Sequence, residues 1–274
     1  MTKIVYVNDR CNQNCVFCLG KHIEDVEIIF DKIKRAKNWI IISGGEPLLN
    51  FEKTMKILVE CKRKKEQHPV SVEFQSNGVL FHNEKLTKKI IGLNVVDEFN
   101  INFPSHQKEL DEKITKTNYF HYRMSGVNNI LKNGGNVRLT FVINLLNYKI
   151  MHEYLKYFQG RDVSIQFSFI QIDGKVRENL FLVPKYNNIK PFISDALEYA
   201  KINRMRVVFD NIPLCILPRY KEFSVDFNKS IKRNKSFYLK SKIEKCRSCS
   251  FGNFCFGPPK KYTELFGHSE IIAL

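Results

Sequence analysis

The chain has 274 residues and a formal net charge of +16, with 43% hydrophobic and 26% charged residues. This composition is typical of a globular protein with one sizeable core and a small appendage, and no apolar run approaches the roughly 18 residues that span a membrane. Asp9 and Arg10 interrupt the N-terminal stretch, so it does not have the pattern of a signal peptide. Eight Cys in a chain without a signal peptide indicate a reducing cytoplasm, where clustered Cys bind metals more often than they form disulfides.

Strands and helices are predicted to alternate from residue 3 to residue 170. Residues 39–42 form a continuous apolar run, as in a buried parallel strand, and residues 26–37 carry apolar side chains at helical spacing. Such alternation indicates parallel βα units with right-handed crossovers. The six units predict an α/β fold with an open, partial (β/α)6 TIM-like barrel. The expected strands are 3–7, 39–42, 70–75, 96–103, 136–143 and 163–170, and the expected helices are 26–37, 51–66, 83–91, 106–132 and 147–158.

From the third strand onward, polar residues recur at every second position, so each polar set lies on one face of its strand. Helices that cover the apolar face would turn the polar face toward the inside of the barrel, where it would line a ligand cavity. An antiparallel sheet with one solvated face is the alternative, and the intervening helices disfavour it. The polar sets are Glu73 and Gln75, Asn100 and Asn102, Arg138 and Thr140, and Ser164, Gln166 and Ser168.

Cys11, Cys15 and Cys18 lie within eight residues, so three thiols are expected to converge on a metal or an iron–sulfur cluster. An odd number of Cys in so tight a loop cannot pair off as disulfides. A structural zinc ion normally takes four protein ligands, and His22 is the one further candidate nearby. A [4Fe–4S] cluster held by three Cys keeps one iron free of protein ligands, which leaves an open position for chemistry.

A second motif, Gly44-Gly45-Glu46-Pro47, directly follows the predicted strand 39–42. Glycines lack a Cβ and let the backbone approach a ligand closely. Pro47 stiffens the exit of the turn, and Glu46 offers a carboxylate at the C-terminal edge of the strand, where sites lie in such folds. Alone, the motif also fits an ordinary turn before a helix.

Together, the C-x3-C-x2-C loop, with Phe17 before its last Cys, and the Gly-Gly-Glu-Pro turn resemble the motifs of radical S-adenosylmethionine (SAM) enzymes. The resemblance implies that Cys11, Cys15 and Cys18 hold a [4Fe–4S] cluster whose free iron is chelated by the methionyl group of SAM. The reduced cluster would cleave SAM to a 5′-deoxyadenosyl radical that abstracts hydrogen from a substrate. The implied SAM contacts are Gly44, Gly45, Glu46 and Pro47 for the methionyl amino group, Phe17 for the adenine, and Ser76, Asn77, Asn102 and Asn144 at the ends of later strands.

The chain departs from the family pattern at the fourth strand. Many relatives carry a Ser-Leu-Asp-Gly-like run there, whereas this chain reads Asn102-Phe103-Pro104-Ser105. The ribose and carboxylate contacts of SAM therefore stay open. No residue is identified as a proton donor or acceptor, and Arg138, Gln166 and Tyr122 are candidates by position alone.

After residue 210 the alternation stops, and the last 64 residues hold Cys215, Cys246, Cys249 and Cys255. Four Cys make a closed ligand set, and their spacing fits a structural zinc ion and a cluster equally well. Behind a radical SAM core, the C-x2-C-x5-C run resembles the single-cluster Twitch form of the SPASM/Twitch subgroup. That resemblance implies a second, auxiliary [4Fe–4S] cluster with a structural or electron-transfer role.

We therefore expect a radical SAM core at 1–210 and a Cys-rich auxiliary domain at 211–274. Residues 216–245 are rich in Lys and poorly periodic, and we expect a loop with one short helix there. The remaining Cys, Cys61, falls on the predicted helix 51–66 and is expected to be an inert thiol.

The expected function is that of a radical SAM oxidoreductase that modifies a ribosomally made peptide by a cross-link, a thioether or an epimerisation. Alternatives are a radical step on a small-molecule intermediate or on tRNA. A non-enzymatic zinc protein that binds nucleic acid is disfavoured, because basic residues such as Lys85, Lys88 and Lys89 are spread along helix faces and aromatic-basic RNA motifs are absent.

The expected partners are a substrate and an electron donor such as flavodoxin or ferredoxin. No association with a membrane is expected. The first strand begins at Lys3, so we expect no N-terminal peptide-recognition domain. A peptide substrate would then be held by the barrel mouth, by the C-terminal tail or by a separate recognition protein.

Overall fold

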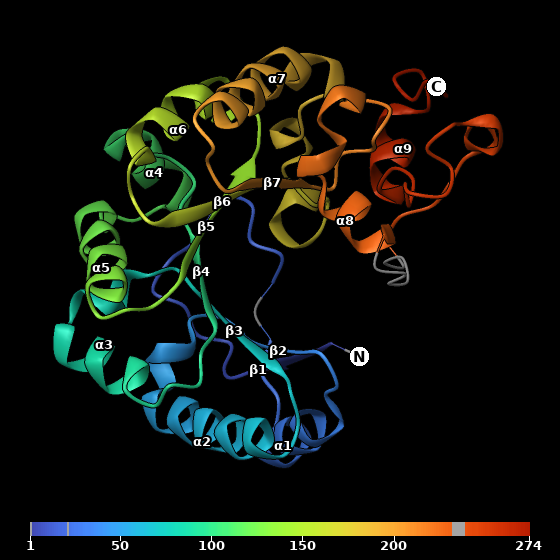
Figure 1. The fold of residues 1–274 in the computed structure, drawn as a ribbon. Coiled ribbons are helices and arrows are strands. Elements are labelled where there is room, and N and C mark those ends of the chain that lie inside the picture. The colour runs from blue at the N-terminus through green and yellow to red at the C-terminus, as the bar shows by residue number, and fades with distance from the viewer. Residues whose placement is uncertain (1, 21, 232–238) are drawn as a thin grey trace. The chain divides into compact units, whose positions relative to one another are not determined.

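The computed structural model describes residues 2–20, 22–231 and 239–274. Its seven strands lie in one sheet in chain order (Figure 1). The strands from β1 to β5 pair in parallel, as do β6 and β7, which confirms the predicted α/β fold with one strand more than the six predicted units. The strands are β1 (Lys3–Tyr6), β2 (Trp39–Ser43), β3 (Ser71–Ser76), β4 (Glu98–Asn102), β5 (Val137–Ile143), β6 (Val163–Phe169) and β7 (Val207–Asp210).

Helices connect the strands and follow the last of them. In the described part of the chain they are α1 (Val26–Arg35), α2 (Phe51–Gln67), α3 (Glu84–Ile91), α4 (Lys108–Thr115), α5 (Phe120–Lys132), α6 (Met151–Phe158), α7 (Tyr186–Ile202), α8 (Val225–Ile231) and α9 (Lys260–Phe266). None of these described helices is long and apolar enough to cross a membrane.

The chain divides into two compact units, residues 1–140 and 141–274, and the division falls within β5. In the first unit, α1 lies beside α2 and α3 lies beside α5 (Figure 1). Alternate strand residues are buried, as the period of a strand requires. Phe74 of β3 and Phe99 of β4 both pack on Phe81, with ring centroids 5.9 Å and 5.5 Å from it, and form the centre of this core.

The polar residues predicted on the other strand face are bonded to one another in the first unit. Gln75 Nε2 donates to Glu73 Oε1 at 2.8 Å, and the Arg138 guanidinium pairs with Glu73 Oε2 at 2.7 Å. Asn100 accepts from Thr140 Oγ1 at 2.6 Å and donates to Glu73 at 2.9 Å. The polar face is therefore a hydrogen-bonded network, and its role as the wall of a ligand cavity stays a prediction.

Two parts of the fold differ from the predicted elements. The predicted helix 106–132 is two helices, α4 and α5, because Lys116 takes a left-handed φ of +57° and ends α4. No element was predicted for 171–210, where the structure has α7 and β7. Pro191 inside α7 and the four-residue length of β7 weaken both patterns. Within the predicted loop 216–245 the short helix is α8, and residues 232–238 lie outside the described residues.

In the second unit, α6 packs on α7 beside β6 and β7 (Figure 1). The Tyr262 ring of α9 stacks on Tyr186 of α7 at 3.9 Å, and its hydroxyl accepts a hydrogen bond from the Tyr186 amide at 2.9 Å. Buried Lys240 pairs with Asp226 at 2.8 Å and with Asp210, the last residue of β7, at 3.3 Å. These contacts hold the C-terminal segment on α7 and β7.

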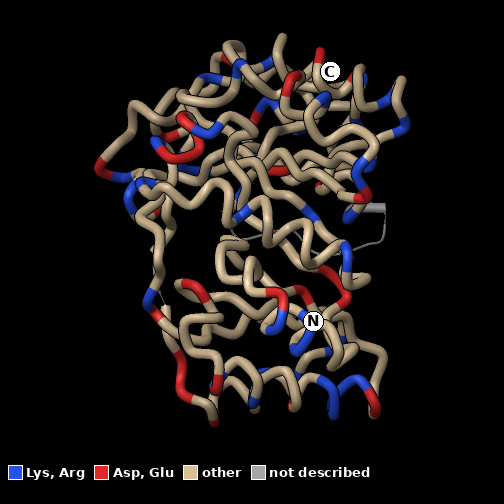
Figure 2. Tube along the Cα trace, turned by 90° about the vertical axis from the view of Figure 1, so that its left-hand side faces the viewer, with Lys and Arg blue, Asp and Glu red and all other residues tan. Residues whose placement is uncertain are grey.

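Lys and Arg are distributed over both units and are interspersed with Asp and Glu (Figure 2). Several form ion pairs within one helix, such as Lys88 with Glu84 at 3.1 Å and Arg35 with Asp31 at 3.0 Å. The positive charge is thus spread over many elements, as the sequence predicts.

Two candidate cysteine sites

The first three Cys lie on the loop between β1 and α1, and all three are partly exposed. The amides of Asn14 and Val16, which flank Cys15, donate to the carbonyls of Thr115 and Ile114 at 3.1 Å and 2.9 Å. These carbonyls belong to the last turn of α4. The helix therefore supports the loop directly beneath its middle Cys.

The thiols of this loop influence one another. The pKa of Cys15 is raised to about 12. Burial is the main cause, and the like charges of the Cys11 and Cys18 thiolates contribute in the same direction. Burial also raises the pKa of Cys11, against the effect of hydrogen bonds from the Gln13 amide and the Asn77 side chain. Neighbouring thiols, among which Cys11 and Cys15 have a raised pKa, fit a cationic iron core, because coordinated iron deprotonates its thiols and compensates their charge.

The Gly-Gly-Glu-Pro turn packs on the chain immediately before Cys11. The Gly45 amide donates to Asn8 O at 2.6 Å and the Glu46 amide to Arg10 O at 2.7 Å. A Cβ on Gly45 would lie 2.0 Å from Arg10 O, and one on Gly44, which has a φ of +139°, would lie 2.6 Å from Asn8 O. Both glycines are therefore required by the approach of the turn to the Cys loop itself.

The Glu46 carboxylate is fully buried and points to the end of β3. It accepts hydrogen bonds from Ser76 Oγ at 2.9 Å, from the Asn77 amide at 2.9 Å and from the Leu48 amide at 3.2 Å. Burial raises its pKa to about 7, although these hydrogen bonds favour the charged form. Pro47 is buried beside it and begins a short 3-10 helix.

Asn77 connects this carboxylate to the Cys loop. Its backbone amide donates to Glu46, while its side-chain amide donates to Asn12 Oδ1 at 2.6 Å and lies 3.8 Å from Cys11 Sγ. Glu46, Ser76, Asn77 and Cys11 thus form one contiguous group, as the resemblance implies. Phe17 is buried in the same unit.

Two further residues predicted to contact SAM lie at the ends of β4 and β5. Asn102 ends β4, and its buried Oδ1 has no hydrogen-bond partner among the described residues. Asn144 belongs to the second unit, where it accepts from the Leu146 amide at 2.9 Å and donates to Val142 O at 2.9 Å. The contacts of Asn144 are those of a turn after β5.

The three candidates for proton transfer have different surroundings. Arg138 is held by Glu73 and Glu98 in the polar network, with nitrogen–oxygen distances of 2.7 Å and 2.8 Å. Tyr122 is 49% exposed on α5, where its ring contacts His82, and Gln166 is partly exposed on β6. The described contacts thus engage Arg138 in ion pairs and give Tyr122 a surface position.

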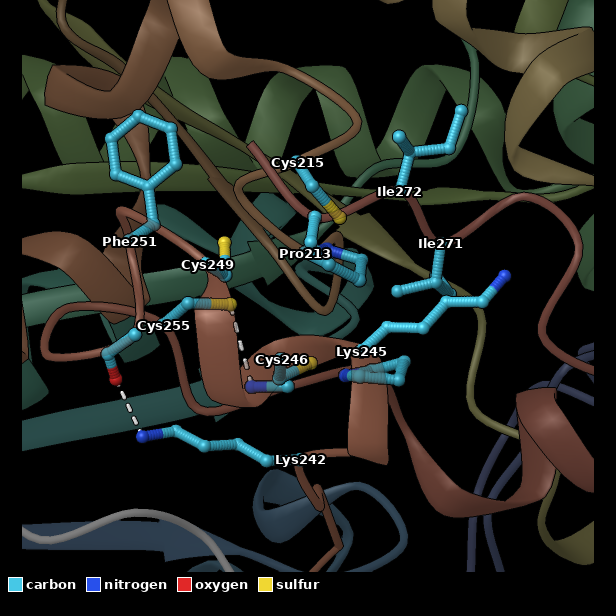
Figure 3. Close-up of a pocket in the computed structure, with 14 residues that line it drawn as sticks. Pro213, Cys215, Lys242, Lys245, Cys246, Cys249, Phe251, Cys255, Ile271 and Ile272 are labelled. Carbon is cyan, nitrogen blue, oxygen red and sulfur yellow. Dashed lines mark hydrogen bonds between the residues drawn. The ribbon is translucent and has the colours of Figure 1, made fainter.

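The other four Cys line one pocket of the second unit, with about 390 Å³ of empty volume, part of it open to solvent. Figure 3 shows the side chains of Cys215, Cys246, Cys249 and Cys255 arranged around this pocket. Cys215 follows β7, whereas the other three come from the segment before α9. The predicted four-Cys set is therefore brought together.

Thiols and two lysines are the charged or ionisable groups that line this pocket. Burial raises the pKa of Cys215 to about 11, and the neighbouring thiols of Cys255, Cys249 and Cys246 contribute in the same direction. Lys242 and Lys245 also line the pocket, and none of its described lining residues is acidic. Four thiolates around a cluster carry net negative charge, which these lysines would offset.

Further parts of the lining were not predicted from the sequence. Residues 271–273 close one side of the pocket, next to Cys215. Gly257 has a φ of +89°, and a Cβ there would lie 2.2 Å from Ser241 O. The backbone amide of Gly257 donates to Cys255 Sγ at 3.4 Å.

A single metal ion and an iron–sulfur cluster require different spacings of their thiolate ligands. Among the described residues, no three His, Cys, Asp or Glu side chains could hold one metal ion. Zinc would draw its four sulfurs to within about 4 Å of one another, because each Zn–S bond is about 2.3 Å. A cluster holds its thiolates farther apart around an iron–sulfide core.

A family comparison identifies the class to which this fold and these motifs belong. The model of the radical SAM superfamily matches residues 5–158, which include the first Cys loop and the Gly-Gly-Glu-Pro turn. The chain belongs to the radical SAM superfamily, and its seven strands form a partial barrel of that type. Membership implies a [4Fe–4S] cluster and SAM as cofactors.

Curated relatives are similar over about two thirds of the chain or more. An uncharacterized protein of Methanocaldococcus jannaschii is 26% identical over 203 residues, which cover 69% of this chain and 68% of the relative. A probable GTP 3′,8-cyclase of Methanococcus aeolicus is 24% identical over 225 residues, which cover 77% of this chain and 74% of the relative.

Two solved structures share the fold. The structure of anSMEcpe with bound AdoMet and the Cp18Cys peptide has a TM-score of 0.68 at 16% identity and covers 95% of this chain and 88% of its own. Streptococcus suis SuiB bound to the precursor peptide SuiA has a TM-score of 0.68 at 12% identity, and the match covers 100% of this chain and 74% of the SuiB chain.

Proposed function

We propose that Cys11, Cys15 and Cys18 hold a [4Fe–4S] cluster with SAM at its open iron, and that the chain thereby abstracts hydrogen from a peptide. The observation that carries the proposal is that the Glu46–Asn77 network contacts the loop of the three Cys at Cys11 and Asn12. When bound, the cluster and SAM supply a 5′-deoxyadenosyl radical by one-electron reduction. The electron would come from a donor such as flavodoxin or ferredoxin.

In this proposal the protein residues orient SAM and keep the loop in place. Gly44, Gly45, Glu46 and Pro47 bind the methionyl end, and the Glu46 carboxylate keeps the turn in place through its hydrogen bonds from Ser76 and Asn77 at the end of β3. Phe17 contacts the adenine. Ser76, Asn77 and Asn102 complete the SAM site, with Asn102 Oδ1 as a buried acceptor ready for a hydroxyl donor.

The C-terminal quartet, within an auxiliary domain at 211–274, holds a second [4Fe–4S] cluster in the same proposal. A cluster is preferred to zinc here because the C-x2-C-x5-C run follows a radical SAM core and resembles the Twitch form of the SPASM/Twitch subgroup. With four protein ligands the cluster has no open iron, so its role is to accept the electron left on the substrate or to stabilise the domain.

A peptide is the proposed substrate because both solved structures named above were determined with peptides, one of them a precursor peptide. A cross-link, a thioether or an epimerisation would each begin with abstraction of hydrogen from such a chain. The peptide would be held by this protein or presented by a separate recognition protein.

A nucleotide is the second candidate substrate, favoured by the GTP 3′,8-cyclase among the relatives and by the net charge of +16. The two candidates separate when release of 5′-deoxyadenosine is measured with GTP and with a mixture of Cys-containing synthetic peptides. At least tenfold stimulation by GTP alone would replace the peptide proposal with the nucleotide.

The test of the cofactor sites is iron and sulfide content, with EPR spectra recorded before and after addition of SAM, on anaerobically reconstituted protein. We expect about eight irons in the parent and about four in the Cys11→Ala/Cys15→Ala/Cys18→Ala variant, because each cluster contributes four. The reduced spectrum should respond to SAM in the parent alone. Cys61→Ala, which changes a buried Cys of α2, is the matched control and should keep all eight.

Two other outcomes are distinct. A content of four irons and one zinc per chain would support the radical SAM site and would indicate that the C-terminal quartet is a structural zinc site. Zinc alone, with no response to SAM, would overturn the proposal.

A further inference from the structure

The chain after α9 returns to the start of α7 through one buried carboxylate. Glu270 Oε1 accepts the Asn187 amide at 2.8 Å, and Glu270 Oε2 accepts the Tyr262 hydroxyl. Asn187 is the second residue of α7, and the first amides of a helix have no partner within it. In the described part of the chain, the N-cap residue Lys185 offers them no side-chain hydrogen bond. Glu270 therefore joins α7, α9 and the residues that follow.

Residues 271–274 run from this carboxylate to the loop of the later cysteines, and we call them the closing segment. Ile271, next to Glu270, is only 2% exposed. At the other end, Leu274 O accepts the Ser250 amide at 2.6 Å, and Ser250 directly follows Cys249. The closing segment is thus held at both ends.

The closing segment forms the side of the pocket on which Cys215 lies. Ile271, Ile272 and Ala273 line the pocket, and Figure 3 shows the first two side chains on the same side of it as Cys215. The Ile272 side chain is also 64% exposed. The same residue borders both the pocket and the solvent, so a single stretch of chain separates them there. Displacement of this stretch would open the pocket beside Cys215.

We propose that Glu270 is a positioning residue that keeps the closing segment against the second cysteine site and thereby retains the cluster held there. This inference rests on the cluster proposed at the C-terminal quartet. Glu270 forms no bond with the cluster and takes no part in electron transfer. Its carboxylate holds the wall of the pocket, because an ionised acceptor makes stronger hydrogen bonds than a neutral one.

The first test is alkylation of Cys215 in the cluster-free protein, followed by mass spectrometry after timed exposure to iodoacetamide. Glu270→Ala removes both acceptor oxygens, and we expect Cys215 to react about tenfold faster or more, because two hydrogen bonds to a charged group are lost and the closing segment opens locally. Glu270→Gln keeps one acceptor oxygen and should give an intermediate rate. Buried Cys61 belongs to the other unit and should react at the parent rate in both variants.

Two control variants separate the position of the closing segment from the stability of its unit. Ile193→Val removes one methylene from the buried face of α7 and destabilises the same unit without removing a hydrogen bond of Glu270. Glu264→Ala replaces an exposed Glu of α9. Both should leave the alkylation rate of Cys215 unchanged. If Ile193→Val accelerated alkylation as much as Glu270→Ala does, Glu270 would act only through the stability of α7, and the inference would be overturned.

The second test follows the release of iron from the reconstituted protein to a chelator. Glu270→Ala should release about four irons about tenfold faster or more than the parent, because one cluster contributes four irons and its pocket is open. The EPR signal that responds to SAM should be unchanged, because the first Cys loop lies in the other unit.

Unchanged alkylation of Cys215 in a folded Glu270→Ala variant overturns the inference. Faster alkylation with unchanged iron release also overturns it, because the closing segment would then move without retaining the cluster. If Glu270→Ala fails to fold, the same two rates in Glu270→Gln decide. A parent with zinc in place of the second cluster would instead overturn that part of the proposed function, while alkylation would still report the closing segment, so the two failures are distinct.

Discussion

The two cysteine sites are supported by different kinds of structure. The N-terminal site places three Cys within eight residues of one loop, and that loop is held by backbone carbonyls, a fully buried carboxylate and the buried ion pair of Arg123 with Asp111. The C-terminal site collects Cys215 and three later Cys around a pocket lined by apolar residues and two lysines. Polar contacts thus position the first site, whereas chain packing shapes the second.

This difference matches the chemistry that each site is proposed to support. An open iron must hold SAM in one orientation, which requires fixed polar groups such as Asn77 around the loop. A cluster with four thiolate ligands needs charge compensation and exclusion of water, which Lys242, Lys245 and the apolar residues of the pocket supply. Variants of one site should therefore leave the other intact.

The largest expected effect is on metal content when the C-terminal quartet is broken. In Cys246→Ala/Cys249→Ala, iron should fall from about eight to about four per chain, because two of four ligands are lost. The SAM-responsive EPR signal and SAM cleavage without substrate should persist, because the first loop lies in the other unit. The measurements are iron analysis, EPR and chromatography of 5′-deoxyadenosine. Loss of the SAM-responsive signal would contradict the independence of the two sites.

The next effect concerns the close approach at the first site. Gly45→Ala would place a Cβ 2.0 Å from the Arg10 carbonyl oxygen, so the turn and the Cys loop must separate. We expect a loss of about 4 kcal/mol or more in the free energy of unfolding of the cluster-free protein, together with loss of the SAM-responsive cluster. Urea unfolding and iron analysis measure both.

Two glycine variants serve as controls for Gly45→Ala. Gly134 has a φ of +84°, and a Cβ added to it would have no neighbour within 4 Å, so Gly134→Ala should cost only about 1 kcal/mol for its left-handed backbone. Gly257→Ala meets Ser241 O at 2.2 Å and should reduce the iron of the C-terminal site instead. If Gly45→Ala were no worse than Gly134→Ala, the proposed coupling of turn and loop would be wrong.

Local motifs explain why the cysteine sites were predictable from the sequence. The spacing of Cys11, Cys15 and Cys18 defines a ligand set within a single loop, and the Gly-Gly-Glu-Pro turn follows a recognisable strand. The parallel fold also followed from the alternation of strands and helices. No element was predicted for 171–210, where Pro191 interrupts the pattern of α7 and β7 is short.

Contacts between distant segments explain what the sequence did not reveal. The motif suggested that Gly45 approaches a ligand, but the atom nearest its missing Cβ is Arg10 O, a neighbour only because β1 pairs with β2. In the sequence, Arg123 is one Arg of a predicted helix. In the structure, the Cys loop packs on α4 and Arg123 Nε donates to Asn77 O. These roles depend on register and docking, which residue spacing does not encode.

The smallest effect is a dependence of stability on pH through Glu46. Its pKa is raised from 4.5 to about 7 by burial, so the folded state binds a proton that the unfolded state releases between these values. The stability contributed by protonated Glu46 is complete below pH 4.5 and is lost as the pH rises through about 7, a change of roughly 3 kcal/mol. Glu46→Gln stays neutral and lacks this change.

The measurement is urea unfolding of the cluster-free parent and Glu46→Gln between about pH 5 and pH 8. The stability of the parent relative to the variant should fall by roughly 2 kcal/mol over this range, because most of the transition lies within it. Glu84→Gln is a control of opposite sign, since hydrogen bonds from Lys88 and Lys132 lower the pKa of exposed Glu84. The parent gains relative stability only as the pH rises toward 4.5, so between about pH 5 and pH 8 the difference between the parent and Glu84→Gln should stay flat. If the difference in unfolding free energy between the parent and Glu46→Gln did not change with pH, the Glu46 carboxylate would be exposed to solvent. The first site would then lack its buried polar support and would resemble the second site, whose pocket is partly open to solvent.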